Sequence, residues 1–523
     1  MSESNNKAVK TVSYIFIITF LGKILALVRD IFLANQYGTS MYSNAFLTAS
    51  RIPRVLFDAI FASAITSSFI PIFNKSMNKE GEQKAFEFSD VFISCISIFM
   101  TAIMILCFIF ARQITSFFAD GFDEQTLNLS IKLLYILLPT MICTGLAFSF
   151  TGILQSMDEF LIPASISVVF NLVIISYYFT LNRFFGIFGL AVFYLIGWIM
   201  QVLIQVPSLK RIGYKYNFKP QFDHPYFRET LFLMIPVMVS TWVQPFNIMI
   251  NAKYASRLYF GAGVSAIEFA NNLYTMLVGV IAISVMNFMF PKISMMVQKN
   301  EEQKFKDAVS DTSLSTLFLV IPLMFGVMSL SGSLISLIYG GNKFDSNSVN
   351  ITSTALYYFS LGMPGYCLQA IFSKVYFAKE NGKVPMIAAI VAIAVNYVLC
   401  IILVEPFAIG GVALASSISV TVNALILLMF MQRDSVKLLD KDFLSEIIKM
   451  VLASAVMYIM IKLVGLIFGI SSSSRLMMLV KIGIQFVVGV ITYFIIVFIL
   501  KTKQTKFIKD LLNSKLNKNR GSK

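Results

Sequence analysis

The amino-acid sequence predicts an all-α, polytopic membrane protein, and three observations carry this prediction. Hydrophobic residues make up 57% of the 523 positions and charged residues only 13%, a composition far outside that of soluble domains. The apolar residues gather in runs long enough to span a bilayer, which takes about 20 residues of helix. The arrangement of these runs repeats once along the chain at a lag of about 220 residues, and such repeats are typical of transporters.

Fourteen transmembrane helices are expected. Their apolar runs start near residues 10, 43, 87, 126, 160, 185, 229, 262, 307, 350, 384, 409, 443 and 474, at about the length that a spanning helix needs. An even number of crossings places both termini on one side of the membrane. Most lysines and arginines of the loops follow even-numbered helices, as Lys210, Arg211 and Lys215 do. By the positive-inside rule these loops and both termini are cytoplasmic.

The internal repeat defines the expected domains. Pro163 at the start of the fifth helix matches Pro385 in the eleventh, and Gly189 in the sixth matches Gly411 in the twelfth. Because each repeat holds six helices, an even number, the two lobes form a parallel pseudo-twofold repeat. We expect an N-terminal lobe at 1–221, a C-terminal lobe at 222–438, two extra helices at 439–503 and a basic cytoplasmic tail at 504–523.

Six charged residues lie inside the first two expected helices. They are Lys23, Arg29, Asp30, Arg51, Arg54 and Asp58. A cation at the centre of a spanning helix costs roughly 2.5 to 3.5 kcal/mol on insertion scales. Such charges are tolerable only where they face a wet cavity or one another, so the sequence predicts a polar cavity inside the membrane.

The balance of these charges points to an anionic ligand. Four cations against Asp30 and Asp58 leave a surplus of two positive charges. A dianion such as a diphosphate matches that surplus, and arginine holds such groups through forked hydrogen bonds. The alternative interpretation is that these residues pair among themselves or snorkel to the membrane surface. The eighth helix contains Glu268 but no cation before Lys292, so we expect the N-terminal lobe to hold most of the anion.

The first two helices resemble the opening of the MurJ/MviN lipid II flippases, in the multidrug/oligosaccharidyl-lipid/polysaccharide exporter superfamily. The likeness covers nearly the whole chain and is carried by Lys23-x-x-Ala26-x-x-Arg29-Asp30-x-x-x-Ala34-x-x-x-Gly38, then Asn44-Ala45-Phe46 and Arg51-Ile52-Pro53. It implies transport of an undecaprenyl-diphosphate-linked peptidoglycan precursor, lipid II, from the cytoplasmic to the outer leaflet of the bacterial cytoplasmic membrane by alternating access. It also implies that the last two helices form a groove for the lipid tail.

The resemblance implies roles for individual residues. Its basic positions fall on Lys23, Arg29 and Arg51, which we expect to bind the substrate together with Arg54. The expected supporting polar residues are Asp30, Asn44, Asp58 and Asn272.

Several positions depart from the family pattern. Asn44 stands where the family has an acidic residue, Asn272 replaces a cavity arginine, and a further basic position falls on Phe57. Cys400, one turn after Asn396, replaces an acidic residue that serves a sodium site in some relatives, which argues against sodium coupling. The membrane potential or another ion gradient stays open as the energy source.

No metal or other cofactor and no nucleic-acid partner are expected, and the protein is expected to be a monomer that contacts its lipid-linked glycan and membrane lipids. The five cysteines lie in apolar stretches without C-x-x-C spacing, and the single histidine is His224. The sequence also lacks the acidic, histidine or glycine-rich motifs of a membrane transferase. Three functions remain open beside the flippase: an exporter of another lipid-linked glycan of the teichoic acid, capsule or exopolysaccharide type, a cation-coupled drug antiporter that uses Asp58 or Glu268, and a non-transporting scaffold.

The predicted topology can be tested with single cysteines. Lys215 lies in a loop expected to be cytoplasmic, and Lys343 lies in a loop expected outside, because cations concentrate in the loops after even-numbered helices. We expect an impermeant thiol reagent to label Lys343→Cys in intact cells and Lys215→Cys only after the cells are opened. Labelling of Lys215→Cys in intact cells would overturn the topology.

Overall fold

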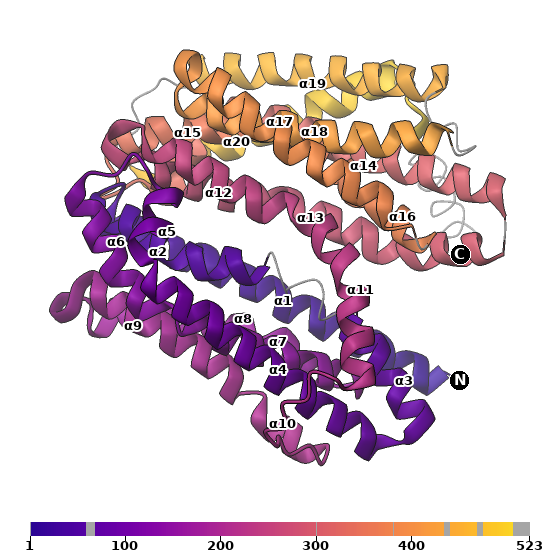
Figure 1. The fold of residues 1–523 in the computed structure, drawn as a ribbon. Coiled ribbons are helices and arrows are strands. Elements are labelled where there is room, and N and C mark those ends of the chain that lie inside the picture. The colour runs from indigo at the N-terminus through magenta and orange to yellow at the C-terminus, as the bar shows by residue number, and fades with distance from the viewer. Residues whose placement is uncertain are drawn as a thin grey trace. The chain divides into compact units, whose positions relative to one another are not determined.

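A computed structural model describes residues 2–58, 68–299, 301–379, 381–433, 440–467 and 474–505 (Figure 1). Within these residues the secondary structure is helical, with a single isolated bridge between Gly341 and Phe344. The all-α fold class predicted from the sequence is therefore confirmed.

The helices follow the predicted order. Their bounds are α1 (Ser2–Tyr37), α2 (Met41–Phe57), α3 (Ile70–Glu80), α4 (Glu82–Ile109), α5 (Ala111–Phe118), α6 (Glu124–Leu137), α7 (Thr140–Ser156), α8 (Leu161–Thr180), α9 (Asn182–Leu203), α10 (Val206–Arg211), α11 (Pro225–Thr241), α12 (Val243–Ser256), the 3-10 helix η3 (Tyr259–Gly261), α13 (Gly263–Gln298), α14 (Glu302–Tyr339), α15 (Ser346–Ser360), α16 (Met363–Ala378), α17 (Lys383–Phe407), α18 (Ile409–Arg433), α19 (Lys441–Ile467) and α20 (Arg475–Ile499). A helix lies at each of the fourteen predicted positions. Four of these positions are divided between two helices: α2 and α3, α6 and α7, α11 and α12, and α15 and α16.

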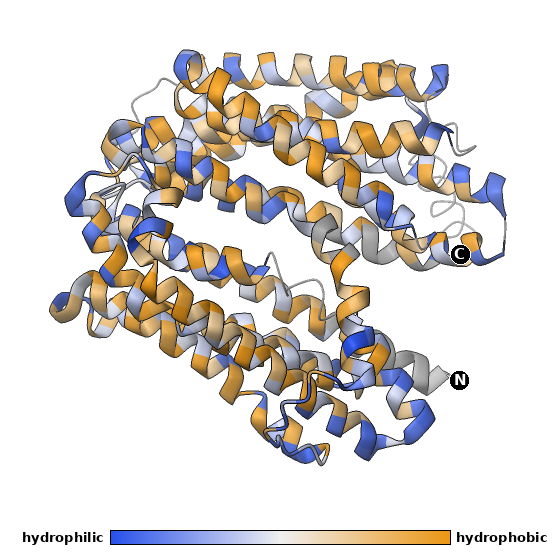
Figure 2. Ribbon diagram, viewed as in Figure 1, coloured by the Kyte–Doolittle hydropathy of each residue, from blue (hydrophilic) through white to orange (hydrophobic). Residues whose placement is uncertain are grey.

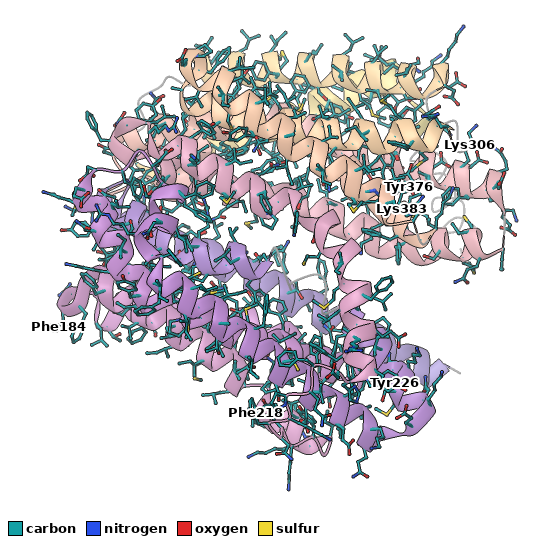
Figure 3. All side chains as sticks on the ribbon, in the orientation of Figure 1. Phe184, Phe218, Tyr226, Lys306, Tyr376 and Lys383 are labelled. Carbon is teal, nitrogen blue, oxygen red and sulfur yellow. The ribbon has the colours of Figure 1, made fainter. Side chains whose placement is uncertain are left out.

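Apolar helices long enough to cross a membrane dominate the chain. Nine helices of the described residues meet this condition, and the pair α6 and α7, bent by 42°, adds a tenth if it is one span. Orange, hydrophobic residues run along the length of these helices (Figure 2). Phe184 is an example, because its side chain is 78% exposed and points away from α9 (Figure 3). Such exposed rings fit a lipid environment.

The chain forms two compact units. The first comprises Met1–Phe269 and Gly341–Ser348, and the second comprises Ala270–Gly340 and Val349–Lys523. These bounds follow from which helices pack together and not from the repeat in the sequence. They therefore do not test the lobes expected at 1–221 and 222–438, which stay a prediction.

Packing between pairs of helices, most of them distant in the sequence, builds the first unit. In it α1 packs along α8, α8 along α9, α2 along α6 and α4 along α7. Buried phenylalanine rings join α4 to the segment that leads into α3: the Phe69 ring centroid lies 4.6 Å from Phe92 and 5.4 Å from Phe88. All three side chains are fully buried. These rings bury a large apolar area and so hold the segment that follows the undescribed residues 59–67 against α4.

The segment that precedes α11 is fastened to α4. Asp90 of α4 accepts a hydrogen bond from the Tyr214 hydroxyl at 2.8 Å and from the Asn217 amide at 3.1 Å, and the Lys219 amide donates to Ser94 Oγ at 2.9 Å. Burial, and then the nearby Asp90 carboxylate, raise the pKa of Tyr214, so its hydroxyl remains a donor. This segment therefore has one defined path across the end of α4.

The two helices near the C-terminus belong to the second unit. Both α19 and α20 pack on α14, where their apolar side chains form one buried cluster. The Tyr493 hydroxyl donates to the Phe318 carbonyl at 2.9 Å, and the Lys503 amide donates to Glu446 at 2.8 Å. The Lys503 amine also pairs with Asp311 at 2.9 Å. The two extra helices are thus held to α14 by packing and by polar contacts at their ends.

The backbone supports the internal repeat. Gly186 near the start of α9 has φ 50° and ψ −137°, and Ala408 between α17 and α18 has φ 46° and ψ −124°. These positions are equivalent in the predicted repeat, and both lie three residues before its matched glycine. Gly189 and Gly411 leave no room for a side chain, since a Cβ would lie 2.3 Å from the Tyr177 hydroxyl or 2.0 Å from the Leu403 carbonyl oxygen. The same turn, in the same place, therefore joins the last two helices of each repeat.

The unusual backbone at this turn generates a test of stability. Glycine adopts positive φ without penalty, whereas alanine in that region costs about 1 kcal/mol or more. We expect Ala408→Gly to stabilise the protein by about 1 kcal/mol and Gly186→Ala to destabilise it by a similar amount. A Cβ at Gly186 meets nothing within 4 Å, so the loss arises from the backbone alone. Thermal unfolding in detergent measures both variants, and a destabilising Ala408→Gly would contradict the assignment.

Candidate substrate-binding site

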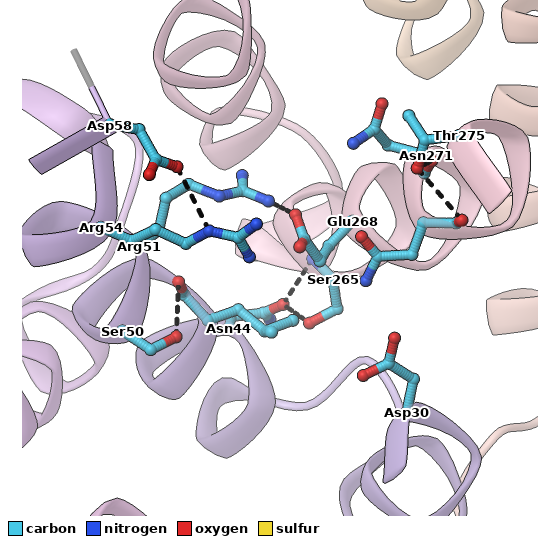
Figure 4. Close-up of polar contacts among 12 residues, drawn as sticks. Asp30, Asn44, Ser50, Arg51, Arg54, Asp58, Ser265, Glu268, Asn271 and Thr275 are labelled. Atoms are coloured by element: carbon cyan, nitrogen blue, oxygen red, sulfur yellow. Dashed lines mark hydrogen bonds and ion pairs between the residues drawn. The ribbon is translucent and has the colours of Figure 1, made fainter. Parts of the chain in front are cut away.

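We take seven charged side chains of the first compact unit together as the candidate site and call them the charge cluster. Its members are Lys23, Arg29 and Asp30 of α1, Arg51 and Arg54 of α2, Asp58 directly after α2, and Glu268 of α13. Figure 4 draws several of them together with neighbouring polar residues. Six of the seven are the intramembrane charges that the sequence singled out, and Glu268 joins them.

Arg29 is held by its neighbour in the sequence. Its Nε and Nη2 donate to Asp30 Oδ1 at 3.0 and 2.8 Å. Its Cζ lies 6.0 Å from the centre of the Phe170 ring of α8, a cation–π distance. The Asp30 side chain is 8% exposed and that of Arg29 21%. One carboxylate oxygen thus receives two of the five donors of the guanidinium, which leaves donors for a further anion.

Arg51 forms an ion pair with Glu268, and this pair joins α2 to α13 (Figure 4). Both side chains are largely buried, with exposed fractions of 9% and 14%. Removing either partner would leave a buried charge without its counter-ion, which typically costs about 3 to 5 kcal/mol. Both residues stand out in the sequence as charges in apolar helices, but their spacing does not predict that they pair. The available signal was a single carboxylate in an otherwise apolar helix.

The other two cations of the charge cluster are held less firmly. Arg54 Nε lies 3.4 Å from Asp58, but the Arg54 side chain is 66% exposed, so water competes with the pair. Lys23 is half-buried and forms no ion pair with any residue that the structure describes. The Gly22 carbonyl beside it accepts a hydrogen bond from Asn171 of α8 at 3.3 Å.

Counting Glu268 changes the charge balance. The charge cluster holds four cations and three carboxylates, so its surplus is one positive charge, not the two counted from the first two helices alone. Three of the four cations have a carboxylate partner, as the alternative interpretation of mutual pairing expected. Binding of a substrate by these residues stays a prediction.

Asn44 positions a helix. The Asn44 side chain is 1% exposed, and its Oδ1 accepts hydrogen bonds from the Ser265 amide at 3.1 Å and from the Ser265 hydroxyl. Ser265 lies in the first turn of α13, whose amides lack partners within their own helix. The Ser43 and Ser265 hydroxyls lie 3.0 Å apart.

Three positions that depart from the family pattern are Phe57, Asn272 and Cys400. The Phe57 side chain is fully buried, with its ring 5.5 Å from that of Phe148 of α7, so a cation there would lie among aromatic rings. Asn272 belongs to the second compact unit, and its main-chain carbonyl accepts a hydrogen bond from the Thr275 hydroxyl at 3.2 Å. In α17 the Cys400 sulfur lies 3.9 Å from Asn396 Oδ1. Among the described residues there is no group of three or more His, Cys, Asp or Glu that could hold a metal ion.

A second set of contacts fastens the turn between α5 and α6 to the end of α12. Asp120 accepts hydrogen bonds from Arg257 Nε and Nη2 at 2.8 and 2.6 Å, and Lys253 lies 3.6 Å away. The Gly121 amide donates to Ser256 Oγ at 3.0 Å. A Cβ at Gly121 would lie 2.4 Å from the Arg257 backbone, so only glycine allows this approach. We call these contacts the α12 latch.

Comparisons with known proteins agree on one family. The family model described as lipid II flippase MurJ matches residues 33–499. "Lipid II flippase MurJ" of Thermosipho africanus is 29% identical over 443 residues, which are 85% of this chain and 89% of that protein. "Probable lipid II flippase MurJ" of Bdellovibrio bacteriovorus is 24% identical over 518 residues, which are 97% and 98% of the two chains.

Solved structures show the same relationship. A structure of lipid II flippase MurJ in an inward closed conformation is 28% identical, covers 95% of this chain and 99% of its own, and superposes with a TM-score of 0.80. An inward-facing multidrug resistance transporter of the MATE family reaches a TM-score of 0.67 at 14% identity over 80% of this chain and 95% of its own, a likeness of fold alone.

We expect the stability of the α12 latch to change with pH only at pH values below the ordinary pKa of a carboxyl group. Burial alone would raise the pKa of Asp120, but hydrogen bonds and charge from Arg257, with Lys253, lower it below 3.8. A carboxylate with a lowered pKa contributes stability that is present above its ordinary pKa and lost as the pH falls through the lowered value. The latch should therefore hold from pH 5 to 8, about the range of maximal protein stability.

Hydrogen exchange of residues 119–123 tests this expectation. Asp120→Asn should speed exchange at pH 7 about fivefold, which corresponds to about 1 kcal/mol for a partly exposed pair. Asp223→Asn is the matched control, because Asp223 lies in another loop, is 90% exposed and pairs with Arg228 of α11. Unchanged exchange in Asp120→Asn would show that the charges do not hold the turn.

Proposed function

The chain belongs to the MurJ family of lipid II flippases, and from this membership we propose that it carries lipid II, an undecaprenyl-diphosphate-linked peptidoglycan precursor, from the inner to the outer leaflet by alternating access. It is a multi-pass protein of the bacterial inner membrane and a transporter, not an enzyme. We further propose that both termini lie in the cytoplasm, which the distribution of loop cations supports.

The observation that carries the proposal is the set of arginines in the apolar first unit. Arg29 and Arg51 are mostly buried, and each already meets a carboxylate. Much of the cost of removing each guanidinium from water has therefore been met before the substrate arrives. A diphosphate offers more charge and more acceptor oxygens than one carboxylate, so exchanging partners is favourable.

Lys23 supplies the first attraction for that anion. It is the cation of the charge cluster without an ion-pair partner among the described residues, and an ammonium group on a flexible stem can follow a moving phosphate. Arg54, largely exposed, adds a second accessible cation. Together they let the diphosphate approach before the buried arginines change partners.

No cofactor is included in the proposal. The membrane potential or an ion gradient supplies the energy, and the protein acts as a monomer. Asn396 and Cys400 provide a carboxamide and a thiol in place of the carboxylate that a sodium ion prefers, so sodium coupling is left out.

Export of another lipid-linked glycan is the second candidate. It is favoured by Phe57 and Asn272, neutral residues at positions where the resemblance implies cations, because fewer charges suit a different head group. Both candidates share the diphosphate and the lipid. Growth of cells depleted of their own lipid II flippase distinguishes them: restored growth supports lipid II, and failure at normal expression favours another glycan.

Arg29 provides the sharpest test of the substrate site. If it binds a diphosphate, Arg29→Lys should impair transport because the forked geometry is lost, and Arg29→Ala should be worse by about 1.5 to 3 kcal/mol. Outward translocation of lipid-linked precursor at matched expression measures both. Arg112→Ala is the control, since Arg112 forms an exposed pair with Glu124.

The double variant Arg29→Ala with Asp30→Ala separates ligand binding from ion pairing. Asp30 is the carboxylate that receives Arg29, so removing both leaves neither charge of the pair buried alone. We expect no rescue of transport. Recovery to near the original rate would mean that Arg29 serves only to neutralise Asp30.

A further inference from the structure

We propose that Glu268 is a built-in competitor of the substrate, which occupies Arg51 in the substrate-free protein and is displaced by the diphosphate. The inference rests on the proposed function and deepens it. Glu268 acts here as a positioning residue: it sets the affinity of Arg51 for an anion and links binding to the contact between α2 and α13.

The first support is the isolation of Glu268. It is the one acidic residue in the sequence of α13, and that helix has no cation before Lys292. Its side chain is 14% exposed and pairs with Arg51, which is 9% exposed. A carboxylate in such a place is costly to bury, so its retention in an apolar helix calls for the partner that it meets on α2.

The second support is the fixed register between the two helices. Asn44 and Arg51 are seven residues apart on α2, and Ser265 and Glu268 are three apart on α13, so each pair shares one helix face. The hydrogen bonds from Ser265 to Asn44 and the ion pair therefore form one continuous strip of contacts (Figure 4). Ser43 extends it, because its hydroxyl contacts that of Ser265 and donates to the Gly38 carbonyl at 2.7 Å.

The third support is the difference between Glu268 and the other acids of the charge cluster. Asp30 pairs with a cation of α1, and Asp58 pairs with a cation of α2, from which it follows directly. The pair of Arg51 and Glu268 instead joins two helices, so an anion that takes Arg51 removes a bond between α2 and α13 and acts on their packing.

Competition then follows from the chemistry of the guanidinium. Arginine keeps its charge, and a diphosphate that takes its forked donors leaves Glu268 without a counter-ion in a largely buried position. The carboxylate must move toward water, which loosens the strip. By thermodynamic reciprocity, any change that removes Glu268 from Arg51 must raise the affinity for the diphosphate.

Lipid binding to the full chain in nanodiscs provides the first test. The probe is undecaprenyl diphosphate, and undecaprenyl monophosphate reports the contribution of the lipid tail. We expect Glu268→Gln to bind the diphosphate about tenfold tighter than the unmodified chain does, while monophosphate binding changes less. Asp58→Asn is the matched control, because it removes the same charge from the charge cluster without touching the strip. If Asp58→Asn bound the diphosphate as tightly as Glu268→Gln does, the gain in affinity would come from the net charge of the charge cluster alone. That result would overturn the proposal.

Cross-linking of Ser43→Cys with Ser265→Cys provides the second test. Their hydroxyls lie 3.0 Å apart, and the five native cysteines are buried or half-buried, so the background should be low. Undecaprenyl diphosphate should lower the cross-linking yield, and Glu268→Gln should lower it without ligand. A purely structural ion pair would also lower the yield in Glu268→Gln, but it would not tighten diphosphate binding.

The outcomes separate this inference from the proposed function. If the unmodified chain binds the diphosphate no better than the monophosphate, the proposed substrate class fails and the inference fails with it. If the chain prefers the diphosphate but Glu268→Gln binds it with unchanged affinity, only the inference is overturned. If the added diphosphate leaves cross-linking unchanged, Glu268 does not link binding to the strip.

Discussion

The cost of a charge in apolar surroundings is the constraint on which this structure depends. Guanidinium groups in α1 and α2 cannot lose their protons, so each must meet an anion or water. The chain solves this with one carboxylate for each arginine, and the source of the carboxylate differs each time. Arg29 uses its neighbour in the sequence, Arg54 uses a residue one turn later, and Arg51 uses Glu268 from another helix.

The packing around the charge cluster follows from that requirement. For Glu268 to reach Arg51, the first turn of α13 must lie against α2, and Asn44 supplies the acceptor that satisfies an amide of that turn. Close contact between the hydroxyls of Ser43 and Ser265 is possible because both side chains are small. Polar contacts of this kind are directional, so they fix the register of two helices that apolar packing alone would leave free to slide.

The sequence predicted what depends on local pattern and on the thickness of the membrane. The positions of the helices, the repeat and the charged residues of α1 and α2 all follow from hydropathy and spacing, and the shared backbone at Gly186 and Ala408 agrees with the predicted lag. Ion-pair partners could not be predicted in the same way. Arg51 and Glu268 are far apart in the chain, and their meeting depends on which helices adjoin. The burial of Phe57 against α7 is likewise a tertiary fact, because its place in the sequence suggested only a missing cation.

The charge balance gives the pairing of Arg51 and Glu268 a meaning beyond stability. With Glu268 in place, the charge cluster has a surplus of one positive charge, and a dianion would leave it negative. With Glu268 displaced toward water, the same four cations face only Asp30 and Asp58, and the surplus of two matches a dianion. Residues 59–67, which the structure does not describe, carry no charged side chain and do not alter this count. The net charge of the charge cluster is thus close to zero in two states: with Glu268 paired to Arg51, and with a diphosphate in its place. In the first of these states an ion pair joins α2 to α13.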